Sequence, residues 1–143
     1  MKNNQTRLEE FENTKHRKQV IELWKTVFGY ESAHNAPEVV IDKKLQNTDS
    51  LFFIAQKGDK VVGTVMAGYD GHRGWIYSIA VHPDCQRQGI GSDLLLHAQG
   101  KLENLGCLKI NLQIMEGNEA VQGFYTANGY SVEQRISMGK KLY

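Results

Sequence analysis

The chain has 143 residues, which is enough for one domain with a hydrophobic core but not for two. Seventeen basic and sixteen acidic residues give a net charge of +1, and this balance argues against a dedicated nucleic-acid or membrane-surface binder. No apolar run has the length of a membrane span, and the polar residues 1–10 do not read as a secretory signal. Cys85 and Cys107 lack metal-ligand spacing, so we expect a cytoplasmic protein with reduced thiols and no bound metal.

The first half of the chain predicts helices followed by a hairpin. Residues 5–11 read as a strand, and apolar residues at helical spacing predict a helix over 13–28, with Trp24 on its core face. A second helix is expected over 37–47, with Pro37 in its first turn. The apolar, β-branched runs 50–57 and 60–70 predict a hairpin joined by a Gly-Asp turn. A second turn over 70–74 then leads to a strand over 75–82.

The second half predicts a strand, a helix and a strand in succession. An amphipathic helix over 89–105 ends before Gly106, which suits a left-handed helix terminus, and "CLKINLQIM" (107–115) reads as a strand. A right-handed crossover makes this strand parallel to strand 75–82. A last helix over 118–128 and a final strand or hairpin over 130–142 complete the prediction. The expected fold is mixed α/β, with a mostly antiparallel sheet of six to seven strands, one parallel pair and about four helices.

The segment between strand 75–82 and helix 89–105 predicts an anion-binding turn. A helix N-terminus carries unpaired N–H groups and a partial positive charge, and glycines allow an anion to approach the backbone closely. Gly89 and Gly91 provide this access, and the remaining donors and charge come from Arg87, Gln88, Ile90 and Ser92. The segment is not a P-loop, and Leu94 replaces the third glycine of the dinucleotide fingerprint. A diphosphate is the expected ligand, although two glycines can also serve only to shape a turn.

Two motifs resemble those of the GNAT superfamily of N-acetyltransferases. Gln86-x-x-Gly89-x-Gly91, after a strand that ends in "AVHP", is similar to the acyl-CoA loop of that family. "NEAVQGFYTANGY" (118–130) resembles its segment in which an asparagine precedes a tyrosine and a Gly-Phe/Tyr pair. The order of strands and helices fits over about residues 5–142. The resemblance implies a single GNAT domain over residues 1–143, in which the parallel pair is splayed.

The resemblance also implies acetyl transfer from acetyl-CoA to an amine. The loop amides of residues 86–92 would bind the pyrophosphate, and free backbone groups around Ile79, Ala80 and Val81 would pair with the pantetheine arm. Asn118 would bond to the same arm, although it can also be a plain helix N-cap. Tyr125 would protonate the departing thiolate, since seven residues place it two helical turns from Asn118, about 10 Å along the axis. A core tyrosine beside Phe124 is the alternative for Tyr125.

The general base is harder to assign from the sequence. Trp75 and Tyr77 occupy the positions where some relatives carry a base on the strand before the loop, and Gln113 stands where another relative has a glutamate. Neither the rings nor the amide readily accept a proton. Glu116 is the named candidate, and the alternatives are Asp70, His72 or a water chain through Tyr77.

The acceptor is predicted only as a class. In the family the loop corresponding to residues 28–38 walls the acceptor site, so Phe28, Tyr30, Glu31 and His34 are candidate lining residues, unless this is an ordinary surface loop. The predicted reaction is acetylation of a primary amine of a small molecule or a protein, by a monomer or homodimer. A non-catalytic acyl-CoA-binding sensor or regulatory module is the alternative.

Overall fold

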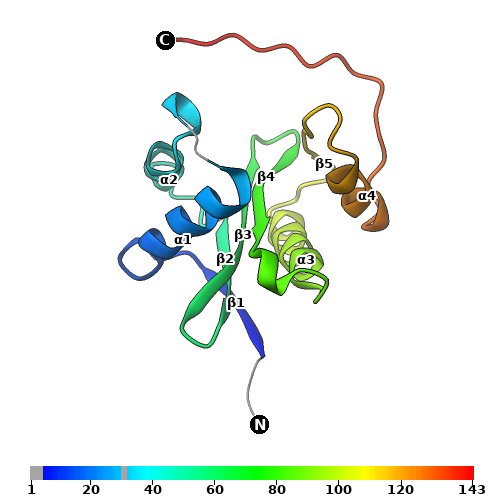
Figure 1. Cartoon of the computed structure of the whole chain (residues 1–143). Coiled ribbons are helices and arrows are strands. Elements are labelled where there is room, and N and C mark those ends of the chain that lie inside the picture. Colours follow the sequence, from blue (N-terminus) through cyan, green and yellow to red (C-terminus); the bar gives the residue numbers. More distant parts are fainter. Residues whose placement is uncertain (1–4, 30–31) are drawn as a thin grey trace. The chain divides into compact units, whose positions relative to one another are not determined.

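The computed structural model describes residues 5–29 and 32–143 and divides into two compact units, Met1–Leu112 and Gln113–Tyr143. The first unit contains a sheet and three α-helices (Figure 1), and the second contains one helix. In chain order the elements are β1 (Thr6–Glu10), α1 (Asn13–Phe28), α2 (Pro37–Leu45), β2 (Phe52–Lys57), β3 (Lys60–Tyr69), β4 (Gly74–Val81), α3 (Ile90–Asn104), β5 (Ile110–Asn111) and α4 (Glu119–Ala127). Short 3-10 turns lie at Ala33–Asn35 and Pro83–Cys85. The four predicted helices and the predicted hairpin β2–β3 are therefore confirmed.

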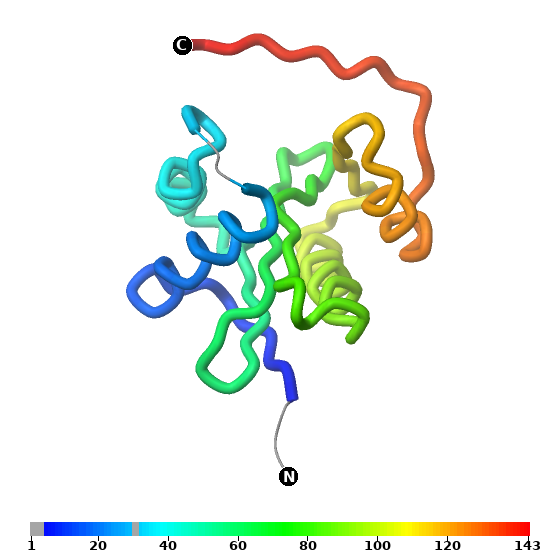
Figure 2. Tube along the Cα trace, in the orientation of Figure 1, coloured from blue at the N-terminus to red at the C-terminus, as the bar shows by residue number. Residues whose placement is uncertain are grey.

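The sheet of the first unit has the order β1-β2-β3-β4-β5. Its pairs are antiparallel except β4–β5, which is parallel and pairs only Gly74 with Ile110 and Trp75 with Asn111. Helices α1 and α2 cover one face of the sheet and α3 covers the other, as Figures 1 and 2 show. The expected parallel pair is present, and the two strands separate after two residues.

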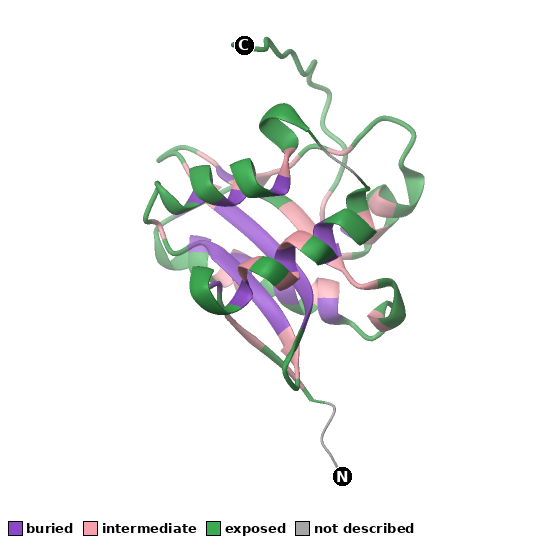
Figure 3. Cartoon of the chain, turned by 60° about the vertical axis from the view of Figure 1, so that its left-hand side comes forward, coloured by how far each residue is buried: buried purple, intermediate pink, exposed green. Residues whose placement is uncertain are grey.

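Buried residues, purple in Figure 3, lie along the strands of the sheet and on the helices that cover it. On one face Trp24 is 3% exposed and stacks on Phe52, whose ring centroid lies 5.9 Å from that of the indole. On the other face α3 packs closely against β3, since a Cβ on Gly63 would lie 2.9 Å from a methyl group of Leu94. This close approach fixes the first turns of α3 over β3, and with them the loop that precedes α3.

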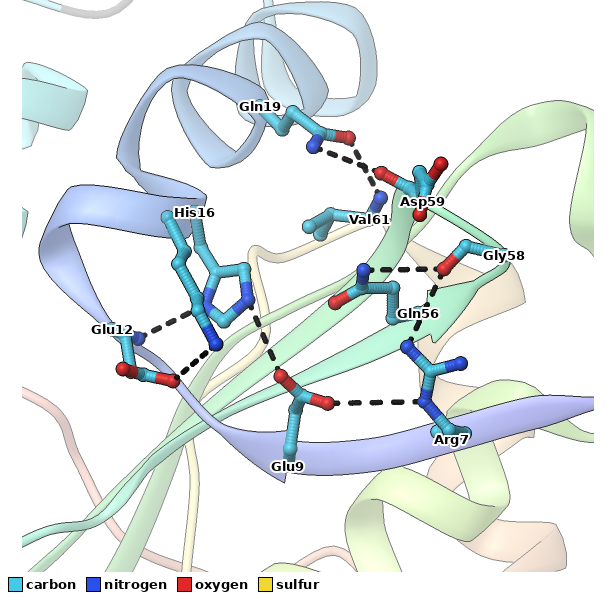
Figure 4. Close-up of polar contacts among 10 residues, drawn as sticks. Arg7, Glu9, Glu12, His16, Gln19, Gln56, Gly58, Asp59 and Val61 are labelled. Carbon is cyan, nitrogen blue, oxygen red and sulfur yellow. Dashed lines mark hydrogen bonds and ion pairs between the residues drawn. The ribbon is translucent and has the colours of Figure 1, made fainter.

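Polar contacts at the edge of the sheet set the position of α1 (Figure 4). Gln19 of α1 donates to the carbonyl of Asp59 (3.2 Å) and accepts from the amide of Val61 (2.8 Å), so one side chain joins the helix to the β2–β3 turn. The buried His16 accepts from the amide at the helix N-cap through Nδ1 (2.9 Å), and its Nε2 lies 3.4 Å from a carboxylate oxygen of Glu9. These contacts fix how α1 lies along the strands, and therefore where Trp24 meets the sheet.

The prediction of six to seven strands is wrong, because the described residues form a sheet of five. The strand expected over 107–115 is reduced to Ile110–Asn111, and residues 130–142 form no strand. The latter segment has alternating apolar residues, but alternation stabilises a strand only where a partner strand buries one face. Val132, Ile136, Met138 and Leu142 are instead 75% to 91% exposed. No helix among the described residues is long and apolar enough to span a membrane.

Candidate active site

The loop between β4 and α3 presents a row of unpaired backbone amides. Arg87 and Gly89 both have left-handed backbone conformations, with φ of 64° and 81°, and Gly89 is the N-cap of α3. The backbone amide of Asp93 donates the first hydrogen bond of α3, to the carbonyl of Gly89 (3.0 Å). Within residues 5–29 and 32–143, the amides of residues 86–92 have no acceptor. This is the arrangement that binds an anion at a helix N-terminus.

Positive charge and open space accompany these amides. Arg87 is exposed, and none of the described carboxylates forms an ion pair with it. Lys57, at the end of β2, donates to Oε1 of Gln88 (2.6 Å). A Cβ on Gly89 would meet none of the described atoms within 4 Å, so the space directly beside this part of the backbone is open. Sequence reasoning missed Lys57, because only the fold brings it to a loop 31 residues away.

Among the described residues, no strand pairs with β4 beyond Trp75 on its β5 side, and we call this stretch the open edge of β4. The amide of Gly74 points toward the β5 side and donates to Lys109 (2.8 Å), whereas the amide of His82 points toward β3 and donates to Val62 (2.8 Å). Backbone groups alternate in direction along a strand, so those of Ile79 and Val81 face the open edge and those of Ala80 face β3. The carbonyl of Val81 accepts from the side chain of Gln86 (3.4 Å). The cofactor-binding role expected for Ile79, Ala80 and Val81 stays a prediction.

A bulge in β4 explains why the amides of Gly74 and His82, eight residues apart, point to opposite sides of the strand. Thr64 pairs with Ala80 and Met66 pairs with Tyr77, so two residues of β4 oppose one of β3. Ser78, one of those two, has a left-handed backbone with φ of 53°. The sequence around Ser78 contains no glycine or other turn signal, so the bulge could not be predicted.

Helix α4 holds the second predicted motif. Oδ1 of Asn118 accepts from the amide of Val121 (3.2 Å), so its N-cap role is confirmed. Tyr125 is 5% exposed, and its ring packs edge-on against those of Phe124 (5.1 Å) and Tyr130 (5.6 Å). Burial, with a smaller contribution from Tyr130, raises the pKa of Tyr125 to about 12. The phenol therefore keeps its proton across the physiological pH range, and its role as a general acid stays a prediction.

The candidate bases differ in their surroundings. Oδ1 of Asp70 accepts from the amides of Arg73 and His72, both at 2.7 Å, and Oδ2 accepts from the indole of Trp75 at 3.3 Å. These hydrogen bonds, the one from Arg73 contributing most, lower the pKa of Asp70 to about 2. Such a stable carboxylate is a poor acceptor for the proton of an amine. Glu116 lies exposed in the turn before α4, and its role as a base stays a prediction.

The acceptor region is described in part. Phe28 is 43% exposed at the end of α1, and His34 is exposed in the 3-10 turn Ala33–Asn35, whereas Tyr30 and Glu31 lie outside the described residues. Trp24 belongs to the core, as predicted. Among the described residues, no group of three or more His, Cys, Asp or Glu side chains is arranged to hold a metal ion.

Comparison with known proteins assigns the family. The sequence model of the acetyltransferase (GNAT) family matches residues 17–130. The chain belongs to the GNAT family. An acetyltransferase of Yersinia enterocolitica is 41% identical over 108 residues, which are 76% of this chain and 77% of that protein. Membership of the GNAT family makes this protein an acyltransferase, as predicted.

Solved GNAT structures share the fold of this chain. The aminoglycoside N-acetyltransferase AAC(6')-Iy in complex with CoA has a TM-score of 0.79 and 19% identity, covering 99% of this chain and 98% of that one. The paia N-acetyltransferase of Thermoplasma acidophilum in complex with coenzyme A has a TM-score of 0.78 and 20% identity, covering 92% of this chain and 93% of that one. At these identities the likeness establishes the fold alone.

Proposed function

We propose that this GNAT protein transfers an acetyl group from acetyl-CoA to a primary amine of a small molecule or a protein. The observation that carries the proposal is the run of unpaired amides at residues 86–92, at the end of a strand whose edge is open. A diphosphate fits these amides, and an extended chain with its own amide groups fits the edge of β4. Coenzyme A has both parts, and two structural relatives were solved with it.

In this proposal the loop and β4 divide the binding of the cosubstrate. The amides of 86–92 and the Arg87 guanidinium hold the diphosphate, and Lys57 adds a second positive charge next to Gln88. The backbone groups of Ile79 and Val81 bond to the pantetheine arm. Acetyl-CoA supplies its acetyl group as a thioester, whose carbon–sulfur bond breaks as the amine nitrogen bonds to the carbonyl carbon.

We assign protonation of the leaving sulfur to Tyr125. With a pKa of about 12 for the phenol and a reference value of about 8.5 for a thiol, complete proton transfer to a free thiolate is about 5 kcal/mol uphill. Tyr125 therefore donates a hydrogen bond to the sulfur as negative charge develops on it, and the proton moves late, because the sulfur becomes basic only as the carbon–sulfur bond breaks. The tyrosinate then regains a proton from water.

Proton removal from the amine is assigned to water, with Glu116 as the side chain to test. A lysine-type amine has a reference pKa of about 10.4, so a small neutral fraction exists at neutral pH and can react without a strong base. Asp70 does not fill this role because its carboxylate is stabilised by three hydrogen bonds.

We place the enzyme in the cytoplasm as a single catalytic domain, on the basis of its two free cysteines and of the family match across most of the chain.

Release of free thiol from acetyl-CoA tests this function. The protein is incubated with acetyl-CoA and a panel of polyamines, amino acids, aminoglycosides and peptides with free N-termini, and the products are identified by mass spectrometry. Acetylation of one amine class, with one thiol released per acetyl group, supports the proposal. Binding of coenzyme A without turnover on any amine would instead favour the non-catalytic module.

A further inference from the structure

We infer that Trp24 and Thr64 are positioning residues that aim the backbone amide of Ile79 into the open edge of β4. This inference rests on the proposed function, since the amide of Ile79 is one of the groups assigned to the pantetheine arm. It adds two side chains from α1 and β3 that need not contact the cosubstrate.

The two side chains form a buried hydrogen-bond chain that ends at the bulge. The indole Nε1 of Trp24 donates to Oγ1 of Thr64 (2.8 Å), and Oγ1 donates to the carbonyl of Ser78 (2.9 Å). Trp24 is 3% exposed and Thr64 is fully buried. An indole N–H is only a donor and a hydroxyl has one proton, so the direction of the chain is fixed from Trp24 to Ser78.

This chain determines which way the next amide points. In a trans peptide the carbonyl of one residue and the N–H of the next point in opposite directions, and the chain contains no cis peptide among its described residues. Because Thr64 holds the carbonyl of Ser78 toward β3, the amide of Ile79 points away from β3 and into the open edge.

The bulge also sets the direction of the rest of the strand. The backbone groups of Gly74 face the β5 side. Without an inserted residue, strict alternation would turn the backbone groups of Ala80 to the open edge and those of Val81 to β3. Because Ser78 is the extra residue of the bulge, the backbone groups of Ile79 and Val81 face the open edge instead. Ser78 is not a glycine, so its left-handed backbone needs a tertiary contact to hold it, and Thr64 provides that contact.

Thr64 is distinguished by its position in β3. Residues 61–67 of that strand are all buried, and Thr64 is their one residue with a polar side chain. A valine has nearly the same shape and would suit the burial equally, so packing alone does not require the hydroxyl. The hydroxyl is used in full, accepting from the helix and donating to the bulge.

The test compares Thr64→Val, which keeps the shape and loses the hydroxyl, with Thr64→Ser, which keeps the hydroxyl. Thr26→Val is the matched control, because Thr26 is exposed on α1 and its hydroxyl donates to the carbonyl of Glu22 in the same helix (3.0 Å). Each variant is assayed well below its own melting temperature. For Thr64→Val we expect the KM for acetyl-CoA to rise about tenfold, with the KM for the acceptor unchanged and with near wild-type values for the other two variants. Unchanged acetyl-CoA kinetics in folded Thr64→Val would overturn the inference.

A second measurement uses the wild-type protein, so it does not depend on how the variants fold. Coenzyme A is titrated into labelled protein, and backbone amide resonances are followed by NMR. We expect the Ile79 amide to shift together with those of the loop 86–92. Shifts in the loop without a shift at Ile79 would overturn this inference and leave the proposed function standing. The absence of shifts at both places would overturn the proposed function itself.

Discussion

Replacing Gly89 with alanine tests the loop through its backbone conformation alone. Gly89 has φ of 81° and ψ of 5°, and a Cβ there would meet no atom within 4 Å. The substitution therefore adds no clash, and its cost is that of a left-handed alanine, about 1–2 kcal/mol. A protein of 143 residues should then lose about 2–6 °C in melting temperature and remain folded at 25 °C.

The strain appears in binding to the extent that the free loop relaxes. A Gly89→Ala loop that relaxes fully out of the left-handed conformation keeps most of its melting temperature, but coenzyme A must then restore the conformation, so the dissociation constant rises about 5- to 30-fold. Isothermal titration calorimetry measures this constant, and thermal unfolding measures stability.

Gly100→Ala is the matched control, because Gly100 lies within α3 and a Cβ there also meets no atom within 4 Å. Alanine should stabilise that helix by about 0.5–1 kcal/mol and leave the affinity for coenzyme A unchanged. Our reasoning is refuted if Gly89→Ala keeps both the melting temperature and the coenzyme A affinity of the wild type.

Three further predictions concern other side chains. Tyr125→Phe should lower kcat about 100-fold or more with little change in the affinity for coenzyme A, and equal losses of kcat and affinity would contradict its role. Because the pKa of Tyr125 is raised to about 12, the kcat of the wild type should show no fall caused by this group between about pH 8 and 10. Lys57→Gln should weaken coenzyme A about two- to fivefold and reduce the salt dependence of binding, and an unchanged salt dependence would exclude Lys57 from the phosphate site. The pKa of Asp70 is lowered from 3.8 to about 2, so its contribution to stability is present above pH 3.8 and is lost as the pH falls through 2. In Asp70→Asn, acid unfolding should lack the loss of stability that comes from protonation of Asp70. Identical acid unfolding transitions in the wild type and in Asp70→Asn would show that this carboxylate contributes no stability.

Local sequence patterns were sufficient to predict most elements of the first unit. The apolar spacing over residues 13–28 predicts α1 and the core position of Trp24, and the Gly-Asp turn predicts the hairpin β2–β3. These features depend on residues close together in the chain. The sequence also indicated the anion-binding loop, because Gly89 directly precedes an amphipathic helix and Gly91 lies in its first turn.

The missed features depend on distant parts of the chain. Lys57 reaches Gln88 only because the fold brings the end of β2 next to the loop. The bulge at Ser78 is bonded to a hydroxyl from β3, which in turn accepts from an indole of α1. The strand expected over 130–142 failed for a related reason, since an alternating pattern does not specify the partner strand. The acceptor is beyond sequence reasoning because no single motif carries it.

A comparison of two ligands tests most directly whether the amides of residues 86–92 bind the diphosphate of coenzyme A. Coenzyme A and pantetheine share the thiol-bearing arm, and pantetheine lacks the diphosphate together with the phosphorylated adenosine attached to it. Calorimetry at constant salt should show coenzyme A binding at least about 100-fold more tightly than pantetheine, since several charge-assisted hydrogen bonds are lost with the diphosphate. Equal affinities for the two ligands, or no binding of coenzyme A, would contradict the account.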